Sequence, residues 1–507
     1  MCTVIFVGPG ASADGSTLLS HSDTGQDSRI RRVPARRHAP GSLAAVHGGL
    51  QEIRSADLND HGEVLGHIPQ VTRTHAYFHS AYSQLNEHRL ALAESTISQR
   101  PELIAQRGEG EQILTIEQAM VFALQRCKRA AEAVALIGRL MERHGFLPSC
   151  GDGGELLVLA DPEDAWVLEV LGVGKGWTVA SGQPGALWAA RRIGRDQTLI
   201  AANWSLLREL DPADPDVRIG TGVEAFAIAR SWQRAGQVLN WQQAFIPLPR
   251  EFAIARLWLF HQRFVPNLRA WPQRQLGADR HQTLDAYNQV VEPLDIYPFS
   301  VRPERALTLG DVMDFHRSAF EGTVYDLTEQ PHWWVQDADG QSRKSELATP
   351  FPGPELRRLL RLTHRRPVAR HFGHYSAICQ LPAAQTATYW VALDNPLVST
   401  WLPLSLALKQ VPAGLSEYDP ERFSEGSARW AVDFVDNLMR LGFQTALPLL
   451  RELRDPFQAS VIARWQQLDP GSTQAQAFAQ QAVDELLLVY REIRQRLLVR
   501  LGNNRWT

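Results

Sequence analysis

Hydrophobic residues near the N-terminus follow the pattern of strands. Residues 3–7 form a β-branched and aromatic run, Thr-Val-Ile-Phe-Val, which predicts a buried strand. Asp14-Gly15 is a hairpin-turn signal, so we expect a tight antiparallel pair between this strand and residues 17–20. The apolar runs at 156–160 and 165–170 flank a turn sequence and predict a second hairpin.

Elsewhere the apolar residues recur with the period of a helix. Thr115 and Gln118 have the spacing of a capping box and begin one predicted helix, and residues 130–144 form the next, which Gly145 ends. Two more helices are predicted over 427–441 and 472–501. The apolar side of the last one predicts packing against the core, with the interface of a homo-oligomer as the alternative.

Strands that alternate with helical segments in this way favour an α+β fold with two sheets over one doubly wound sheet. No Ser/Gly-rich linker or low-complexity tract marks a boundary. We therefore predict a single domain over 1–507, with helical elaborations around 211–294 and 427–501.

The composition of the chain limits the classes of binding partner that we expect. The 507-residue chain is 44% hydrophobic and 21% charged, as in ordinary globular proteins, and its net charge is −3. This balance gives no electrostatic reason to expect nucleic acid or an anionic membrane as a partner. The sequence shows neither a secretory signal nor an apolar run near the ~20 residues that span a bilayer, so we expect a cytoplasmic protein without membrane contact.

Sequence motifs predict neither a metal nor a cofactor. The four cysteines lie far apart and include no Cys-x-x-Cys pair, which argues against a zinc site or a disulfide framework. His75 and His79 have i, i+4 spacing, but the glutamate of a zinc-protease motif is missing and the segment looks extended. The glycine-rich stretch 172–176 is too short for a dinucleotide-binding fingerprint and lacks the Ser or Thr of a P-loop.

Candidate chemistry lies at the second residue. Loss of Met1 would give Cys2 a thiol and a free α-amino group on one residue. A thiolate is a strong nucleophile, and an α-amino group titrates near ~7.7–8.0, so one residue would supply both nucleophile and base. The alternative is a small buried hydrophobic residue at an unimportant terminus.

The sequence around Cys2 resembles peptidase family C69, whose dipeptidases are N-terminal nucleophile (Ntn) hydrolases. Members typically begin Met-Cys-Thr, followed by an apolar strand, Gly, Ala and Asp-Gly-Ser. Three more blocks follow in the family's order, so the resemblance spans most of the chain; they are Ile68-Pro69-Gln70-Val71 with Leu85-Asn86-Glu87-His88 and 90–96, Ala202-Asn203, and 297–303 with 321–328.

The resemblance nominates site residues besides Cys2. Asn86 and Asn203 lie in matching blocks and are expected to stabilise an oxyanion with their side-chain amides. Family members usually carry Arg-Asn-x-Asp after the first hairpin. Counted without gaps, this chain has His21 in place of the arginine and Thr24 in place of the aspartate, with Asp23 one position early. His21 could replace the arginine as a donor, and Asp23 could serve if the strand ended one residue differently.

The resemblance implies a four-layer αββα Ntn-hydrolase fold and a cysteine peptidase that hydrolyses dipeptides or other short peptides without a cofactor or metal. An amidase or acylase acting on non-peptide amides would keep this fold and change the substrate. A catalytically silent, secernin-like binding protein is the alternative from another class, and the departure at residues 21–24 is what supports it.

Overall fold

A computed structural model describes residues 2–24, 27–53, 61–151, 153–268, 284–291 and 297–501. The chain forms two compact units. Unit 1 comprises Met1–Pro249, Pro298–Thr308 and Ile378–Tyr389, and unit 2 comprises Arg250–Tyr297, Leu309–Ala377 and Trp390–Thr507. The prediction of a single domain over 1–507 stays a prediction.

A six-stranded sheet has the order β14-β1-β2-β20-β21-β22. Its central pair is antiparallel, with Thr3 opposite Ser22 and Val7 opposite Leu18. Both central strands are fully buried, as their apolar composition predicts. The strands are β1 (Thr3–Val7), β2 (Thr17–Asp23), β14 (Thr198–Ala201), β20 (Tyr375–Leu381), β21 (Thr388–Leu393) and β22 (Leu402–Leu404).

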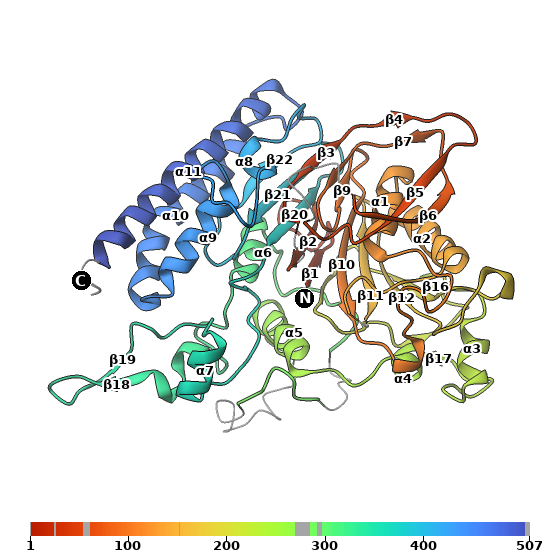
Figure 1. The fold of residues 1–507 in the computed structure, drawn as a ribbon, viewed down its shortest axis with the longest axis horizontal. Helices are drawn as coiled ribbons and strands as arrows, with labels where there is room; N and C mark the ends of the chain where they lie inside the picture. The colour runs from red at the N-terminus through yellow and green to blue at the C-terminus, as the bar shows by residue number, and fades with distance from the viewer. Residues whose placement is uncertain are drawn as a thin grey trace. The chain divides into compact units, whose positions relative to one another are not determined.

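An eight-stranded sheet in unit 1 has the order β16-β13-β12-β11-β10-β9-β8-β3. Figure 1 shows β10, β11 and β12 next to one another. Strand β10 contacts both β1 and β2, so the middle of this sheet lies against the sheet that contains the N-terminus. Its strands are β3 (Arg31–Val33), β8 (Tyr77–His79), β9 (Leu85–Asn86), β10 (Ala91–Ile97), β11 (Gly154–Ala160), β12 (Ala165–Leu171), β13 (Leu187–Arg192) and β16 (Val217–Ile219).

Helices and two-stranded ribbons complete unit 1. Helix α2 packs along β11, β12 and β13, and α1 contacts β8 and β9. The helices of this unit are α1 (Ile116–Arg126), α2 (Ala130–His144), α3 (Val223–Ala229), α4 (Trp241–Phe245) and two 3-10 turns, Pro101–Leu103 and Val179–Ser181. The ribbons pair β4 (Arg36–Arg37) with β7 (Arg73–Thr74), β5 (Leu43–Gly48) with β6 (Glu63–Pro69), and β15 (Glu209–Leu210) with β17 (Leu239–Asn240).

Unit 2 is mainly helical. Its three C-terminal helices, α9, α10 and α11, lie side by side (Figure 1). The helices of this unit are α5 (Glu251–Phe264), α6 (Leu309–His316), α7 (Pro354–Leu360), α8 (Ala413–Ser416), α9 (Ala428–Met439), α10 (Phe443–Trp465), α11 (Thr473–Arg500) and two 3-10 turns, Leu327–Glu329 and Pro331–Trp333. One ribbon pairs β18 (Trp334–Gln336) with β19 (Ser342–Lys344).

The mixed α+β class, the antiparallel hairpins and the C-terminal helices are confirmed. Helix α2 ends at Gly145, whose φ of 69° a residue without a side chain adopts at little cost. Helix α11 begins where predicted, since the Ser472 side chain accepts a hydrogen bond from the Ala475 N–H. The capping box at α1 is wrong in detail, because Thr115 makes no side-chain cap bond.

Two expectations differ from the structure. The first hairpin is not tight, because Gly8 and Gly10 donate their N–H groups to the carbonyls of Gln197 and Arg195 and carry the chain past β14 before it turns back. Residues 211–294 are mixed where described, since β16 and β17 accompany α3, α4 and α5. Within the described ranges, no helix is both long enough and apolar enough to cross a membrane.

Candidate active site

The register of the six-stranded sheet fixes the surroundings of Cys2. Strand β1 pairs Thr3 with Ser22 on one side and Val4 with Ala201 on the other. Carried one residue further, the β1–β2 register places Cys2 opposite Asp23. Directly opposed residues in antiparallel strands share a face of the sheet, and so do His21 and Asp23, two positions apart on β2. Cys2, His21 and Asp23 therefore share one face at the start of β1, whereas Asn203 lies two residues after the end of β14.

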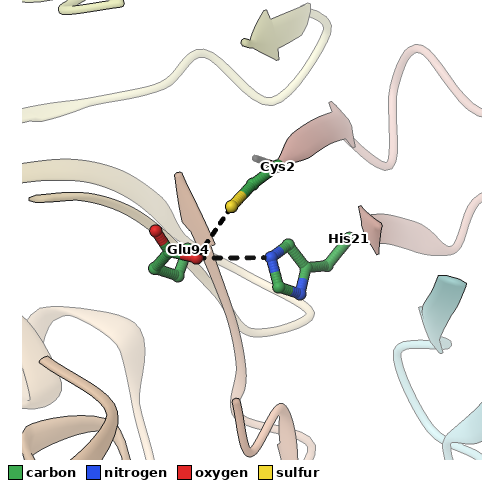
Figure 2. A group of neighbouring side chains, drawn as sticks. All are labelled: Cys2, His21 and Glu94. Atoms are coloured by element: carbon green, nitrogen blue, oxygen red, sulfur yellow. Dashed lines mark hydrogen bonds and ion pairs between the residues drawn. The ribbon is translucent and has the colours of Figure 1, made fainter. Parts of the chain in front are cut away.

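Two buried carboxyl groups flank the Cys2 thiol. Its Sγ lies 3.1 Å from Asp23 Oδ1 and 3.1 Å from Glu94 Oε2. The first contact comes from the neighbouring strand, and the second comes from β10 of the other sheet (Figure 2). Cys2 is 1% exposed and Glu94 is fully buried. A thiol has one hydrogen, so it donates to one of these carboxyl groups at a time.

This environment keeps the thiol protonated. Burial, followed by the charges of Asp23 and Glu94, raises the pKa of Cys2 well above its ordinary value. Burial also opposes ionisation of Asp23. The chain's terminal amino group, the His21 ring and the bond from Cys2 outweigh this effect and lower the pKa of Asp23. The site thus holds a charged carboxylate beside a neutral thiol, and a base is required to make the thiolate.

His21, on β2, lies close to the carboxyl group of Glu94. Its Nε2 lies 3.6 Å from Glu94 Oε2, and Figure 2 shows its ring turned towards Glu94. Its Nδ1 lies 2.7 Å from Nε2 of Gln84, whose amide can only donate. Nδ1 is therefore an acceptor, which leaves Nε2 to carry a proton towards Glu94. The rings of His21 and Tyr82 pack in a T-shaped arrangement, with their centroids 5.8 Å apart.

A second glutamate lies next to Glu94. Thr96 of β10 is opposite Glu155 of β11, so Glu94, Thr96 and Glu155 share one face of the sheet. Thr96 Oγ1 donates to Glu94 Oε1 at 2.9 Å. Glu155 is fully buried beside Glu94. Burial and the charge of Glu94 raise the pKa of Glu155 well above its ordinary value.

Asn203 follows β14 and bonds to β10 of the other sheet. Its N–H donates to Ser95 Oγ at 2.9 Å, and its side-chain Nδ2 donates to the Thr96 carbonyl at 2.9 Å. Its φ of 61° lies in the left-handed region, which asparagine tolerates better than most residues. This turn holds the amide next to the strand segment that also carries Glu94.

Asn86 is engaged elsewhere. Both hydrogens of its side-chain amide are used, since Nδ2 donates to the Leu124 and Cys127 carbonyls at 2.8 and 2.9 Å. Its Oδ1 accepts from the His88 and Leu90 N–H groups at 2.9 and 3.1 Å. In this conformation the amide has no hydrogen left for an oxyanion. Asn86 ties the turn after β9 to the end of α1.

The structure thus brings together Cys2, His21 and Asp23. It places Asn203 against the β10 segment that carries Glu94, and it leaves Asn86 out of the group. Sequence reasoning missed Glu94, Gln84 and Glu155. Glu94 was inside a block that resembles family C69, but its approach to Cys2 depends on the packing of two sheets. No local sequence pattern predicts a contact between residues that are 92 positions apart.

The same group has ligand types that zinc accepts. One atom each from Cys2, His21 and Glu94 lies within 4.8 Å of the other two. Thiolate, imidazole and carboxylate are all zinc ligands. Such an ion would occupy the sulfur that a nucleophile needs, so metal binding here and nucleophilic attack by Cys2 exclude one another.

Comparisons with known proteins agree on one family. A model of Peptidase family C69 matches residues 1–454. The chain is 24% identical to a probable dipeptidase B of Lactococcus lactis over 480 residues, which cover 92% of this chain and 86% of the relative. It is 22% identical to a probable dipeptidase of Salmonella dublin over 346 residues, covering 64% and 68%.

Proposed function

The chain belongs to peptidase family C69, and from that premise we propose that it hydrolyses dipeptides or other short peptides with the sulfur of Cys2 as nucleophile. We further propose that its sheets and helices form the four-layer αββα arrangement of Ntn hydrolases. The contact of β10 with β1 and β2, together with α2 on β11–β13, is consistent with that arrangement.

One observation carries the proposal. The Cys2 thiol is buried directly before the core strand β1, 3.1 Å from each of two carboxyl groups that come from different sheets. A cysteine of no importance at a chain terminus would not require two buried carboxyl groups around it, because burying such groups is costly. Clusters of this kind are typical of catalytic sites.

The mechanism requires that Met1 be removed. The free α-amino group of Cys2 then accepts the thiol proton, and the thiolate attacks the peptide carbonyl carbon to form a C–S bond. The resulting ammonium group returns its proton to the leaving amine as the C–N bond breaks. Water, deprotonated by the same amine, hydrolyses the thioester. The negative charge of Asp23, which the β1–β2 register places opposite Cys2, would favour the ammonium form. Gln84 bonds to His21, whose ring faces Glu94.

The oxyanion of each tetrahedral intermediate needs a donor near the sulfur. We assign this role to the side-chain amide of Asn203, which lies two residues after β14, the strand that pairs with β1. Its bonds to β10 fix its position before the substrate arrives. We also infer a cytoplasmic location for the working enzyme, because reducing surroundings keep a nucleophilic thiol from oxidising.

A panel of dipeptides and N-acyl amides tests this function. Wild-type protein, Cys2→Ala and the matched control Cys379→Ala would be assayed together, with intact mass recorded for each. Cys379 is a buried thiol of β20 with no assigned role in catalysis. We expect wild type and the control to lack Met1 and to hydrolyse dipeptides, and Cys2→Ala to be inactive.

Other results would favour the alternatives. Cleavage of N-acyl amides but not dipeptides would indicate an amidase. A chain that retains Met1 and cleaves neither class would indicate a binding protein. Dipeptide hydrolysis by Cys2→Ala at the wild-type rate would overturn the nucleophile assignment while leaving the peptidase intact.

A further inference from the structure

A second cluster of metal-ligating side chains lies in unit 1, outside the group around Cys2. It consists of His75, Glu87 and His88, and one potential ligand atom of each lies within 4.8 Å of the others. The two histidine rings meet edge to face, with centroids 4.2 Å apart. Sequence analysis argued against a metal at His75 and His79, and the residues that His75 meets here lie 12 and 13 positions after it.

The ligand atoms have the spacing of a zinc site. Zn²⁺ binds imidazole nitrogen and carboxylate oxygen at ~2.0–2.2 Å, so two ligands of a tetrahedral ion lie about 3.3 Å apart. Nδ1 of His75 lies 3.1 Å from Nε2 of His88 and 3.6 Å from Oε1 of Glu87. Two histidines and one glutamate, with water in the fourth position, form a ligand set that zinc uses.

The backbone N–H group of each of the three residues donates a hydrogen bond that holds the residue in place. The His75 N–H donates to the Gln125 carbonyl at 2.8 Å, and the Glu87 N–H donates to the Ala76 carbonyl at 2.9 Å. The His88 N–H donates to Oδ1 of Asn86, whose amide is bonded to the end of α1. The turn that Asn86 anchors is therefore the same turn that presents Glu87 and His88.

Charged side chains of both signs lie near the cluster. Glu87 supplies the negative charge that a divalent cation requires. Lys128 and Arg73 are the cations that face the cluster, and they weaken binding of a divalent ion. The Glu87 side chain is one-third exposed, so the cluster is open to solvent on that side.

We propose that His75, Glu87 and His88 form a zinc-binding site that joins β7 and the turn after β9. The ion has no part in the hydrolysis proposed above. It links two segments that the backbone already holds near one another, and its expected effect is on stability.

Zinc titration by isothermal calorimetry tests the site, with untagged full-length chain carrying Cys2→Ala. That substitution removes the competing thiol, so the readout does not depend on peptidase activity. We expect one Zn²⁺ per chain and a higher unfolding temperature with zinc. Adding Glu87→Gln, His88→Gln or His75→Gln should weaken binding at least tenfold. His67→Gln is the matched control, because His67 is an exposed histidine of β6, and it should bind as the parent does.

Folding and ligand identity are checked separately. Glu87→Gln retains the Oε1 that accepts from the Ala76 N–H, and unfolding temperatures in EDTA show whether each variant is folded. X-ray absorption of the zinc complex should show nitrogen and oxygen ligands at ~2.0–2.2 Å and no sulfur at ~2.3 Å. The site is refuted if no zinc binds, if a sulfur ligand appears, or if two of the three folded variants bind zinc as tightly as the parent.

Discussion

At the scale of single residues, the thiol of Cys2 depends on the charges around it. Asp23 approaches Sγ along the register of β1 and β2, and Glu94 approaches from β10. Both charges stabilise the protonated thiol, and both also favour a positive charge on a neighbouring amine. The same carboxylates that suppress the free thiolate therefore support the proton transfer that the proposed reaction requires.

Asp23→Asn separates these two effects. Removing the charge should lower the pKa of Cys2, so iodoacetamide should alkylate Cys2 faster than in wild type at neutral pH. Peptidase activity should fall on the order of 10²-fold in kcat/KM, because the amine loses the charge that favours its protonated form. Asp339→Asn, at an exposed position, is the control and should change neither rate. Slower alkylation together with lost activity would contradict this account of Asp23.

Glu155 gives a pH dependence of stability. Its pKa is raised in the folded state by burial and by the charge of Glu94. The folded chain therefore keeps a proton that the unfolded chain loses above about pH 4.3. This stabilisation is complete below that pH and is lost as the pH rises towards the folded-state pKa.

Glu155→Gln cannot titrate at this position, so its unfolding temperature should fall less than that of wild type between about pH 5.5 and pH 8. Differential scanning fluorimetry across this range measures the difference. Glu224→Gln, at an exposed position of α3, should follow the wild-type profile. Parallel profiles for Glu155→Gln and wild type would show that Glu155 is ionised throughout.

At the scale of elements, helix α2 shows how packing overrides intrinsic preference. Gly138 lies inside this helix, where alanine would be favoured by ~1 kcal/mol. A Cβ at that position would lie 2.5 Å from Cε2 of Trp188 on β13. The indole cannot move away freely, because its Nε1 donates to Glu142 of the same helix at 2.8 Å.

Gly138→Ala should therefore destabilise the protein by about 1–3 kcal/mol, in spite of the better helix former. Chemical denaturation measures the loss. Adding Trp188→Leu should make the alanine less costly than it is beside the indole, because the ring is gone, which a double-mutant cycle detects. A stabilising effect of Gly138→Ala in the wild-type background would mean that the sheet adjusts to the new methyl group.

Elements with strong local signals were predictable. The end of α2 at Gly145 and the start of α11 at Ser472 each rest on a residue whose backbone or side-chain preference acts within one turn. The loop between β1 and β2 was not, because Gly8 and Gly10 bond to residues almost 190 positions away. The Asp14-Gly15 signal was present, but tertiary bonds determined where the chain turned.

At the scale of the whole molecule, family resemblance and geometry contributed different parts of the site. The resemblance to the family nominated Cys2 and Asn203. Alignment to the family without gaps placed Asp23 one position before the family's aspartate. Strand register resolves that mismatch, since Asp23 shares a face with His21 and lies opposite Cys2. Glu94 and Glu155 could not be predicted, because their approach depends on packing between sheets and on cross-strand pairing. Asn86 was predicted as an oxyanion donor because it lies in a block that resembles the family, but its side-chain hydrogen bonds anchor a turn.

Graded alkylation of Cys2 tests the central claim most directly. Purified enzyme would be treated with increasing amounts of iodoacetamide up to an excess, and peptide mass mapping would give the labelled fraction of each cysteine while residual dipeptidase activity is measured. The account predicts an N-terminal peptide that begins at Cys2, and activity that falls in proportion to the fraction of Cys2 alkylated, independently of label on the exposed Cys150. Full activity in enzyme whose Cys2 is completely alkylated would contradict it.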